Sequence, residues 1–174
     1  MSPVFAALIL AAATVTEPIL VEVDRGNNEI VVRFELASDL PEAAAESLSS
    51  GATVEINYPL RVYSRRRLIP DRRVWKGVAR ASVAFDAVTG RYLCQLVVNG
   101  STTVSREVDT EDAARRWLLA PPAVEVPLPQ GRRDAYLRVR VRAVFSSGTT
   151  WLVFPTSEGT EWVEVRLEAQ RDDE

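Results

Sequence analysis

The sequence has no histidine, and it has one cysteine and one methionine among its 174 residues. The missing histidine removes the commonest general base and the commonest metal ligand, so a Ser-His-Asp or Cys-His catalytic arrangement within this chain is excluded. The single cysteine, Cys94, forms no internal disulfide and no cysteine-based zinc site. Because Cys94 falls in an alternating apolar run, we interpret it as a buried, inert thiol.

Other catalytic signatures are missing as well. The sequence has no glycine-rich phosphate loop and no serine nucleophile elbow, and acidic pairs such as Glu111-Asp112 have no partner base. We therefore predict no catalytic residue, no metal site and no cofactor, and a non-enzymatic binding or scaffolding module. The alternative function is a hydrolase or transferase that uses acidic residues in a cleft, which requires convergent carboxylates with perturbed pKa values.

Long apolar runs are scarce, and the N-terminus holds a short one. The run from Val4 to Ala13 is too short to span a bilayer as a conventional helix, and Ala11-x-Ala13 matches a signal-peptide cleavage site. We predict a signal peptide at residues 1–13 and a single domain at residues 14–174, in a periplasmic or secreted protein. A buried N-terminal helix is the alternative. We do not expect an integral membrane protein.

Positive charge is concentrated in one part of a chain whose net charge is −3. Residues 61–80 contain eight basic side chains and one acid, Asp71. The densest part is a loop that holds Arg65, Arg66, Arg67, Arg72 and Arg73. Several guanidiniums together can hold phosphate or carboxylate groups, so this loop is our candidate site for an anionic partner. The alternative is a solvated hairpin tip whose arginines pair with acids such as Glu55 or Asp71.

Export decides which partner the arginine loop is expected to bind. In an exported protein nucleic acid is not expected, and an unknown envelope protein or an anionic surface is the predicted partner. A second group of arginines, Arg138, Arg140 and Arg142, alternates along one face of a predicted strand. It is either a continuation of the basic surface or a solvent face with acidic cross-strand neighbours such as Glu164 and Glu168.

Alternation of apolar and polar residues predicts a chain of strands, because successive side chains leave opposite faces of a sheet. Residues 52–63 form the clearest case, with Val54, Ile56, Tyr58, Leu60 and Val62 on one face. Strands are also predicted near residues 19–23, 30–36, 75–85, 92–98, 102–107, 135–145 and 160–168. Asn99-Gly100 is a strong hairpin signal. The prolines in residues 120–131 predict an extended connection.

Two short helices interrupt the strands. The first covers residues 43–48, with Ser38 or Asp39 as its cap, Pro41 in its first turn and Gly51 after its end. The second opens at residues 109–112 and carries the apolar stripe that includes Trp117 and Leu118. About eight strands without a βαβ rhythm predict a mainly β fold, an antiparallel β-sandwich with two short helices. A curved, partly open barrel is the alternative.

Three stretches together resemble the bacterial domain-of-unknown-function family 4390: residues 60–74 (LRVYSRRRLIPDRRV), 84–92 (AFDAVTGRY) and 108–117 (VDTEDAARRW). The resemblance covers roughly residues 17–168. It implies a single domain in an exported, uncharacterised protein. It implies no activity, because that family offers no catalytic motif to match.

Overall fold

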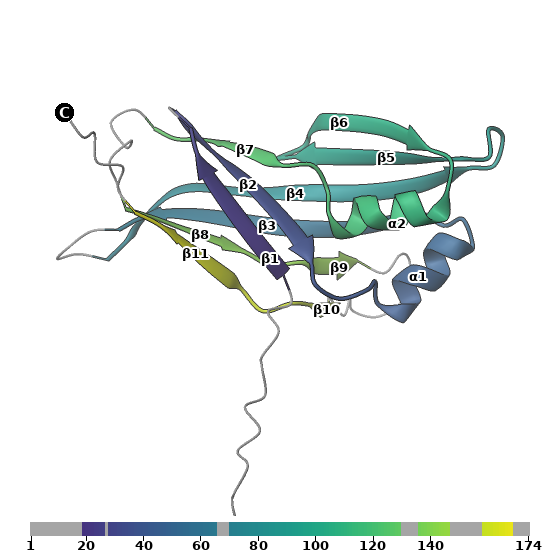
Figure 1. The fold of residues 1–174 in the computed structure, drawn as a ribbon, viewed down its shortest axis with the longest axis horizontal. Coiled ribbons are helices and arrows are strands. Elements are labelled where there is room, and N and C mark those ends of the chain that lie inside the picture. Colours follow the sequence, from purple (N-terminus) through teal and green to yellow (C-terminus); the bar gives the residue numbers. More distant parts are fainter. Residues whose placement is uncertain (1–18, 27, 66–69, 130–135, 147–157, 169–174) are drawn as a thin grey trace, which may run out of the picture.

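The computed structural model describes residues 19–26, 28–65, 70–129, 136–146 and 158–168, which form two antiparallel sheets and two helices (Figure 1). The small sheet has the order β1-β2-β7, and the large sheet contains eight strands built around β3. The strands are β1 (Ile19–Arg25), β2 (Glu29–Leu36), β3 (Val54–Ser64), β4 (Arg72–Asp86), β5 (Arg91–Val98), β6 (Ser101–Val108), β7 (Val124–Pro127), β8 (Leu137–Val141), β9 (Val144–Ser146), β10 (Glu158–Gly159) and β11 (Val163–Leu167). The helices are α1 (Glu42–Ser49) and α2 (Glu111–Leu119).

The strand β3 is the centre of the large sheet. One of its edges pairs with β4 over its whole length, and the other pairs first with β9 and then with β8. Strands β5 and β6 continue the sheet beyond β4, while β11 and β10 pair with β8 and β9. All alternate residues of β3 from Val54 to Val62 are buried, as the alternation in the sequence predicts.

The predicted strand at residues 135–145 is interrupted, and a proline explains the break. Strand β8 ends at Val141 and β9 begins at Val144. The break lies beside Pro59 of β3, whose carbonyl accepts the Arg142 N–H at 3.4 Å but whose nitrogen has no hydrogen to donate in return. Thr160 compensates, because its hydroxyl accepts the Ala143 N–H while its own N–H donates to the Ala143 carbonyl.

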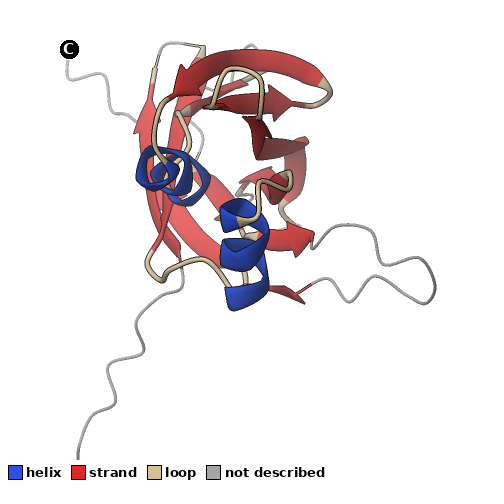
Figure 2. Cartoon of the chain, turned by 90° about the vertical axis from the view of Figure 1, so that its right-hand side faces the viewer, coloured by secondary structure: helices blue, strands red, loops and turns tan. Residues whose placement is uncertain are grey.

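The small sheet covers one half of the concave side of the large sheet, and the helices cover the other half (Figure 2). The two sheets meet where the rings of Phe34 and Tyr58 lie 4.4 Å apart. The Tyr58 hydroxyl donates to the Leu118 carbonyl at 2.7 Å, which attaches the end of α2 to the sheet. Burial of this hydroxyl raises the pKa of Tyr58. The two sheets and the helices therefore share one core.

The predicted fold class is confirmed: the described chain is mainly β, sandwich-like and not closed into a barrel. Two local predictions were wrong. Helix α1 begins directly after Pro41, with no side-chain cap from Ser38 or Asp39. Residues 124–127, predicted as part of an extended connection, form β7 and pair with β2, because Pro127 stands at the end of the strand where a missing N–H is tolerated.

Other predictions fall outside the described residues or are untested. The predicted signal peptide at residues 1–13 lies outside them, so the division of the chain into signal and domain remains a prediction. No helix among the described residues is long and apolar enough to cross a membrane.

Candidate anion-binding face

The outer side of the large sheet carries basic side chains because of the way its strands pair. In β3, Arg61 and Tyr63 point away from the core and are half-buried. Lys76 of β4 and Arg140 of β8 lie directly opposite Arg61, and Glu164 of β11 lies opposite Arg140. One row across the sheet therefore holds three cations next to one carboxylate.

This row is unfavourable for the sheet itself. Oppositely charged side chains in facing positions stabilise a sheet by roughly 0.2–1 kcal/mol per pair, and like charges in the same positions destabilise it. Here Arg61 faces a like charge on both of its neighbouring strands. The repulsion is modest, since exposed charges about 4 Å apart interact by only about 1 kcal/mol in water. The fold tolerates the row, but its stability does not require it.

Trp162, which precedes β11, holds three of these cations together. The guanidinium carbon Cζ lies 4.5 Å from the centre of the indole ring for Arg61, 5.4 Å for Arg140 and 5.0 Å for Arg142. Each such cation–π contact contributes about 0.5–1 kcal/mol at an exposed site, which offsets the repulsion between neighbouring arginines. Contact with one ring also holds the three guanidiniums near one another, so the positive charge is concentrated in one place.

In the next row of the sheet an arginine again contacts an aromatic ring, but this arginine also pairs with two carboxylates. Arg138 lies opposite both Tyr63 and Arg166, and its Cζ is 5.2 Å from the centre of the Tyr63 ring. Its guanidinium pairs with Asp71 at 2.9 Å and with Glu164 at 3.5 Å. We call the whole surface the basic face. It consists of Arg61, Tyr63, Arg73, Lys76, Arg138, Arg140, Arg142, Trp162, Glu164 and Arg166.

Glu164 is shared by three cations. Its carboxylate lies 3.3 Å from Arg166, 3.5 Å from Arg138 and 3.8 Å from Arg140. The acidic neighbours expected for the alternating arginines are found for Arg138 and Arg140, which contact Glu164, whereas Glu168 pairs with none of the three among the described residues. Glu164 contacts only part of the basic face. In the part of the chain that the structure describes, neither Arg61 nor Arg142 forms an ion pair. The Nε atoms of both side chains are buried there without a hydrogen-bond partner.

The predicted arginine loop lies at the end of the basic face. Arg65 is exposed, its N–H donates to the Tyr136 carbonyl, and its side chain lines a hollow of about 380 Å³. Arg73 is exposed and lies opposite Tyr63, which places it on the basic face, and Arg72 is exposed opposite Ser64. Arg66 and Arg67 lie outside the described residues.

Two acids were proposed to neutralise the loop. Asp71 pairs with Arg138 of β8, and Glu55 pairs with Arg80 at 3.1 Å. Because Arg66 and Arg67 lie outside the described residues, the anion site and the neutralised hairpin tip both remain predictions for this loop.

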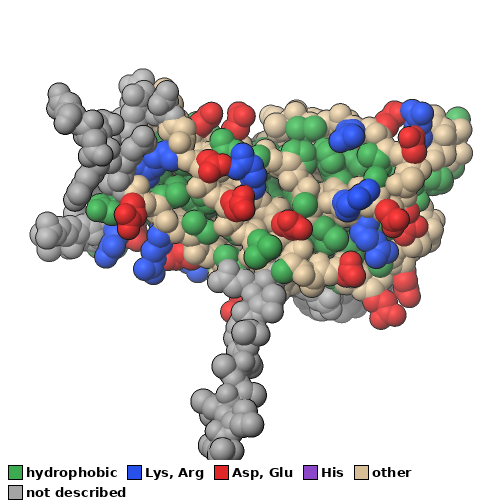
Figure 3. Space-filling model, in the orientation of Figure 1, with side chains coloured by type: hydrophobic (Ala, Val, Ile, Leu, Met, Phe, Trp, Pro, Cys, Tyr) green, Lys and Arg blue, Asp and Glu red, His purple; other side chains and the backbone are tan. Residues whose placement is uncertain are grey.

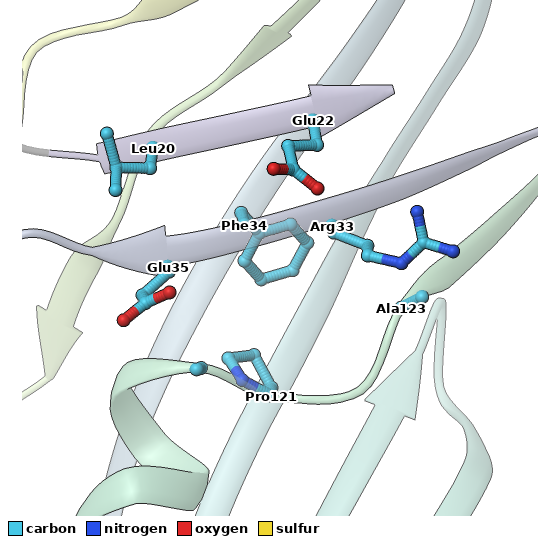
Figure 4. A pocket seen from close by; sticks show the side chains of 8 residues that line it. Leu20, Glu22, Arg33, Phe34, Glu35, Pro121 and Ala123 are labelled. Carbon is cyan, nitrogen blue, oxygen red and sulfur yellow. The ribbon is translucent and has the colours of Figure 1, made fainter. Parts of the chain in front are cut away.

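The hollow that best matches the enzymatic alternative lies between the small sheet and the segment after α2 (Figure 4). It has a volume of about 270 Å³ and presents the carboxylates of Glu22 and Glu35 from neighbouring strands, with Arg33 beside them. Both carboxylates are at exposed positions. Among the described residues no group of acids, with or without Cys94, could hold a metal ion. The enzymatic alternative remains a prediction.

Cys94 has the environment expected of an inert thiol. It is fully buried on the core side of β5. Burial raises its pKa to about 11, partly opposed by the positive charge of Arg106. Since the thiolate is the reactive form, this residue is not a candidate nucleophile in the folded protein.

The described fold and face define a mainly β, sandwich-like domain with one basic sheet surface. A model of the family DUF4390, described as a domain of unknown function, matches residues 17–150, and the chain belongs to this family. The resemblance found from the sequence is thereby confirmed. Comparisons with curated proteins and with solved structures give no match. Arg61, Arg140 and Arg142 lie within the matched residues, whereas Trp162 and Glu164 lie beyond them.

Proposed function

We propose that the protein is an exported, non-enzymatic binding module that engages an anionic partner through the basic face and the adjoining loop within residues 61–80. The observation that carries this proposal is the row in which Lys76, Arg61 and Arg140 face one another across three strands. Binding explains this row because an anionic partner turns its mutual repulsion into attraction. Stability does not explain it, since alternating charges would serve the sheet better.

Export is the second element of the proposal. It is supported by the apolar run from Val4 to Ala13 and the Ala11-x-Ala13 site. Expressed with its own N-terminus in a Gram-negative host, the protein is expected in the periplasmic fraction without residues 1–13. Intact protein that begins at Met1 and stays in the cytoplasm would contradict this.

Binding is tested with two anionic probes, polyglutamate and vesicles containing phosphatidylglycerol. The wild-type chain is expected to bind at least one of them, with an affinity that falls steeply as salt is added. The face variant carries Arg140→Gln and Arg142→Gln, and we expect it to bind about tenfold more weakly. The loop variant carries Arg65→Ser, Arg66→Ser and Arg67→Ser, and we expect it to lose retention while its melting temperature stays nearly unchanged.

Arg80→Gln is the matched control. Arg80 lies on the outer side of the same sheet but already pairs with Glu55, so its loss should leave binding unchanged. The proposal fails if the wild type binds neither probe, or if the face variant binds as the wild type does. If only the loop variant binds normally, the loop is the solvated hairpin tip of the alternative interpretation and the basic face alone is the site.

A further inference from the structure

We propose that the occupant of the basic face is an extended acidic segment of a partner polypeptide, with carboxylates at alternate positions, lying along β8. This inference rests on the proposed function and specifies its partner. The arginines of the basic face belong to two groups: three of them contact the protein's own Glu164 carboxylate, and Arg61 and Arg142 do not.

The first group shows what the face binds. The Glu164 carboxylate lies within 3.8 Å of the guanidiniums of Arg138, Arg140 and Arg166. It reaches them from a neighbouring extended strand that pairs antiparallel with β8. The protein itself therefore demonstrates that an acidic side chain on an extended chain, lying beside β8, can serve several of these arginines at once.

The second group offers an equivalent position. Arg61 and Arg142 are held against the same indole ring, at 4.5 and 5.0 Å from its centre. Within the described ranges neither guanidinium forms an ion pair, and the Nε atoms of both, like those of Arg138 and Arg140, are buried without a hydrogen-bond partner. A carboxylate from a partner placed above Trp162 would bind both cations, as Glu164 does on the other side. Charge-assisted contacts of this kind are about twice as strong as neutral hydrogen bonds.

The spacing of the arginines favours an extended partner. Arg138 and Arg140 occupy alternate outward positions of β8, about 6.7 Å apart along the strand, and Arg142 follows directly after the strand and contacts the same Trp162 ring as Arg140. Alternate side chains of an extended polypeptide repeat at the same distance. A segment with acids at every second position therefore places one carboxylate beside Arg61 and Arg142 and the next toward Arg140, which lies 3.8 Å from Glu164.

The same surface is less suited to a membrane. Peripheral binding to lipid combines basic side chains with apolar side chains that enter the interface. On the basic face the aromatic rings of Tyr63 and Trp162 are half-buried beneath guanidiniums. Among the exposed large apolar residues, Val78 lies within β4 and Tyr136 directly precedes β8, so they come from separate strands of the large sheet.

The experiment measures binding of labelled peptides to the full chain by fluorescence anisotropy. The probe is a peptide of about eight residues, roughly 27 Å long when extended, with glutamate alternating with threonine. The comparison peptide has the same composition with its glutamates consecutive. We expect the alternating peptide to bind several-fold more tightly, and Arg61→Gln with Arg142→Gln to weaken it about tenfold. Arg80→Gln, the control, should bind as the wild type does.

The outcomes separate this inference from the function on which it rests. If the chain binds phosphatidylglycerol vesicles through Arg61 and Arg142 but binds neither peptide, the proposed function stands and the acidic segment is rejected. Equal binding of the two peptides rejects the extended spacing. Salt-sensitive self-association that the double variant removes would identify a second copy as the occupant instead. If the chain binds no anionic probe at all, both proposals fail.

Discussion

The outer faces of the two sheets are built from the same kind of strand but arrange their charges in opposite ways. On the outer side of the small sheet Arg33 lies opposite Glu22 and pairs with Asp24, so the one cation at its described outward positions lies among carboxylates. The nearby Asp24 raises the pKa of the Arg33 guanidinium. On the large sheet Arg61 lies between Lys76 and Arg140. One arginine is neutralised by its neighbours and the other is repelled by them.

The way in which charges pair across a sheet therefore indicates its function better than the number of charges does. The outward positions of the small sheet are mostly acidic: Glu22, Asp24, Glu29, Glu35 and Glu125. Figure 3 shows this side of the molecule, where acidic, basic and apolar side chains are interspersed. Such a surface is what solvation and modest cross-strand pairing require. The basic face departs from that pattern, and for this reason we assign binding to the large sheet.

The largest effect is expected when the core under both faces is disrupted. Ile56 and Val141 are fully buried, and replacing either with aspartate leaves an unpaired charge in the apolar interior. That costs several kcal/mol against a typical stability of about 5–15 kcal/mol. We expect loss of cooperative thermal unfolding, measured by circular dichroism. A variant that melts as the wild type does would show that the inward side of β3 or β8 is assigned wrongly.

A smaller loss is expected at Gly77, which lies under the basic face on the core side of β4. A Cβ atom there would clash with the Trp75 ring and lie 2.6 Å from Asn99 Oδ1. We expect Gly77→Ala to destabilise the domain by roughly 1–3 kcal/mol, as other overpacking substitutions do. Chemical denaturation measures this. An unchanged midpoint would mean that Trp75 and Asn99 move aside without cost.

Cys94 provides a readout that keeps core and surface effects apart. Because burial raises its pKa to about 11, the folded protein at neutral pH should react very slowly with thiol reagents. We expect fast reaction only on unfolding, and unchanged slow reaction in variants of either outer face. Rapid labelling of the folded wild type would contradict the assignment of Cys94 to the core.

Most elements of the fold could be predicted from the sequence. Alternation reveals strands whenever one face is buried, as in β3, where Val54 to Val62 are buried at every second position. Helix α2 was predicted from its acidic first turn, and Thr110 does cap it by accepting the Ala113 N–H. Strand β7 and the break after Val141 were not predicted. Both depend on long-range pairing, with β2 and with Pro59 respectively, which no local pattern contains.

The candidate site was predicted only in part, because it too depends on long-range pairing of strands. The arginines at 138, 140 and 142 and those of the loop were singled out as two separate groups. The two groups form one surface because the register of β3 and β8 places Arg61 opposite Arg140. These two residues are far apart in the sequence. Trp162 was missed, since a lone aromatic residue before a strand has no distinguishing signal. The pairing of strands, and not the local composition, creates the basic face.

The two outer faces differ in the sign of their charge pairing, and the same substitution made once on each face tests this difference. Arg61→Glu creates opposite charges facing Arg140 and Lys76, whereas Arg33→Glu creates like charges beside Glu22 and Asp24. Both change the same residue type at an outward strand position, so intrinsic strand preference cancels.

The measurement is the melting temperature of both variants at low salt, together with binding of polyglutamate. We expect Arg61→Glu to melt slightly higher than the wild type, for a net gain of up to about 1 kcal/mol after the loss of its contact with Trp162, and to lose binding. Arg33→Glu should melt lower by a similar amount and keep binding, and added salt should shrink both shifts. If both variants lose stability alike and both bind polyglutamate as the wild type does, the two faces do not differ in charge pairing, and the assignment of anion binding to the basic face is wrong.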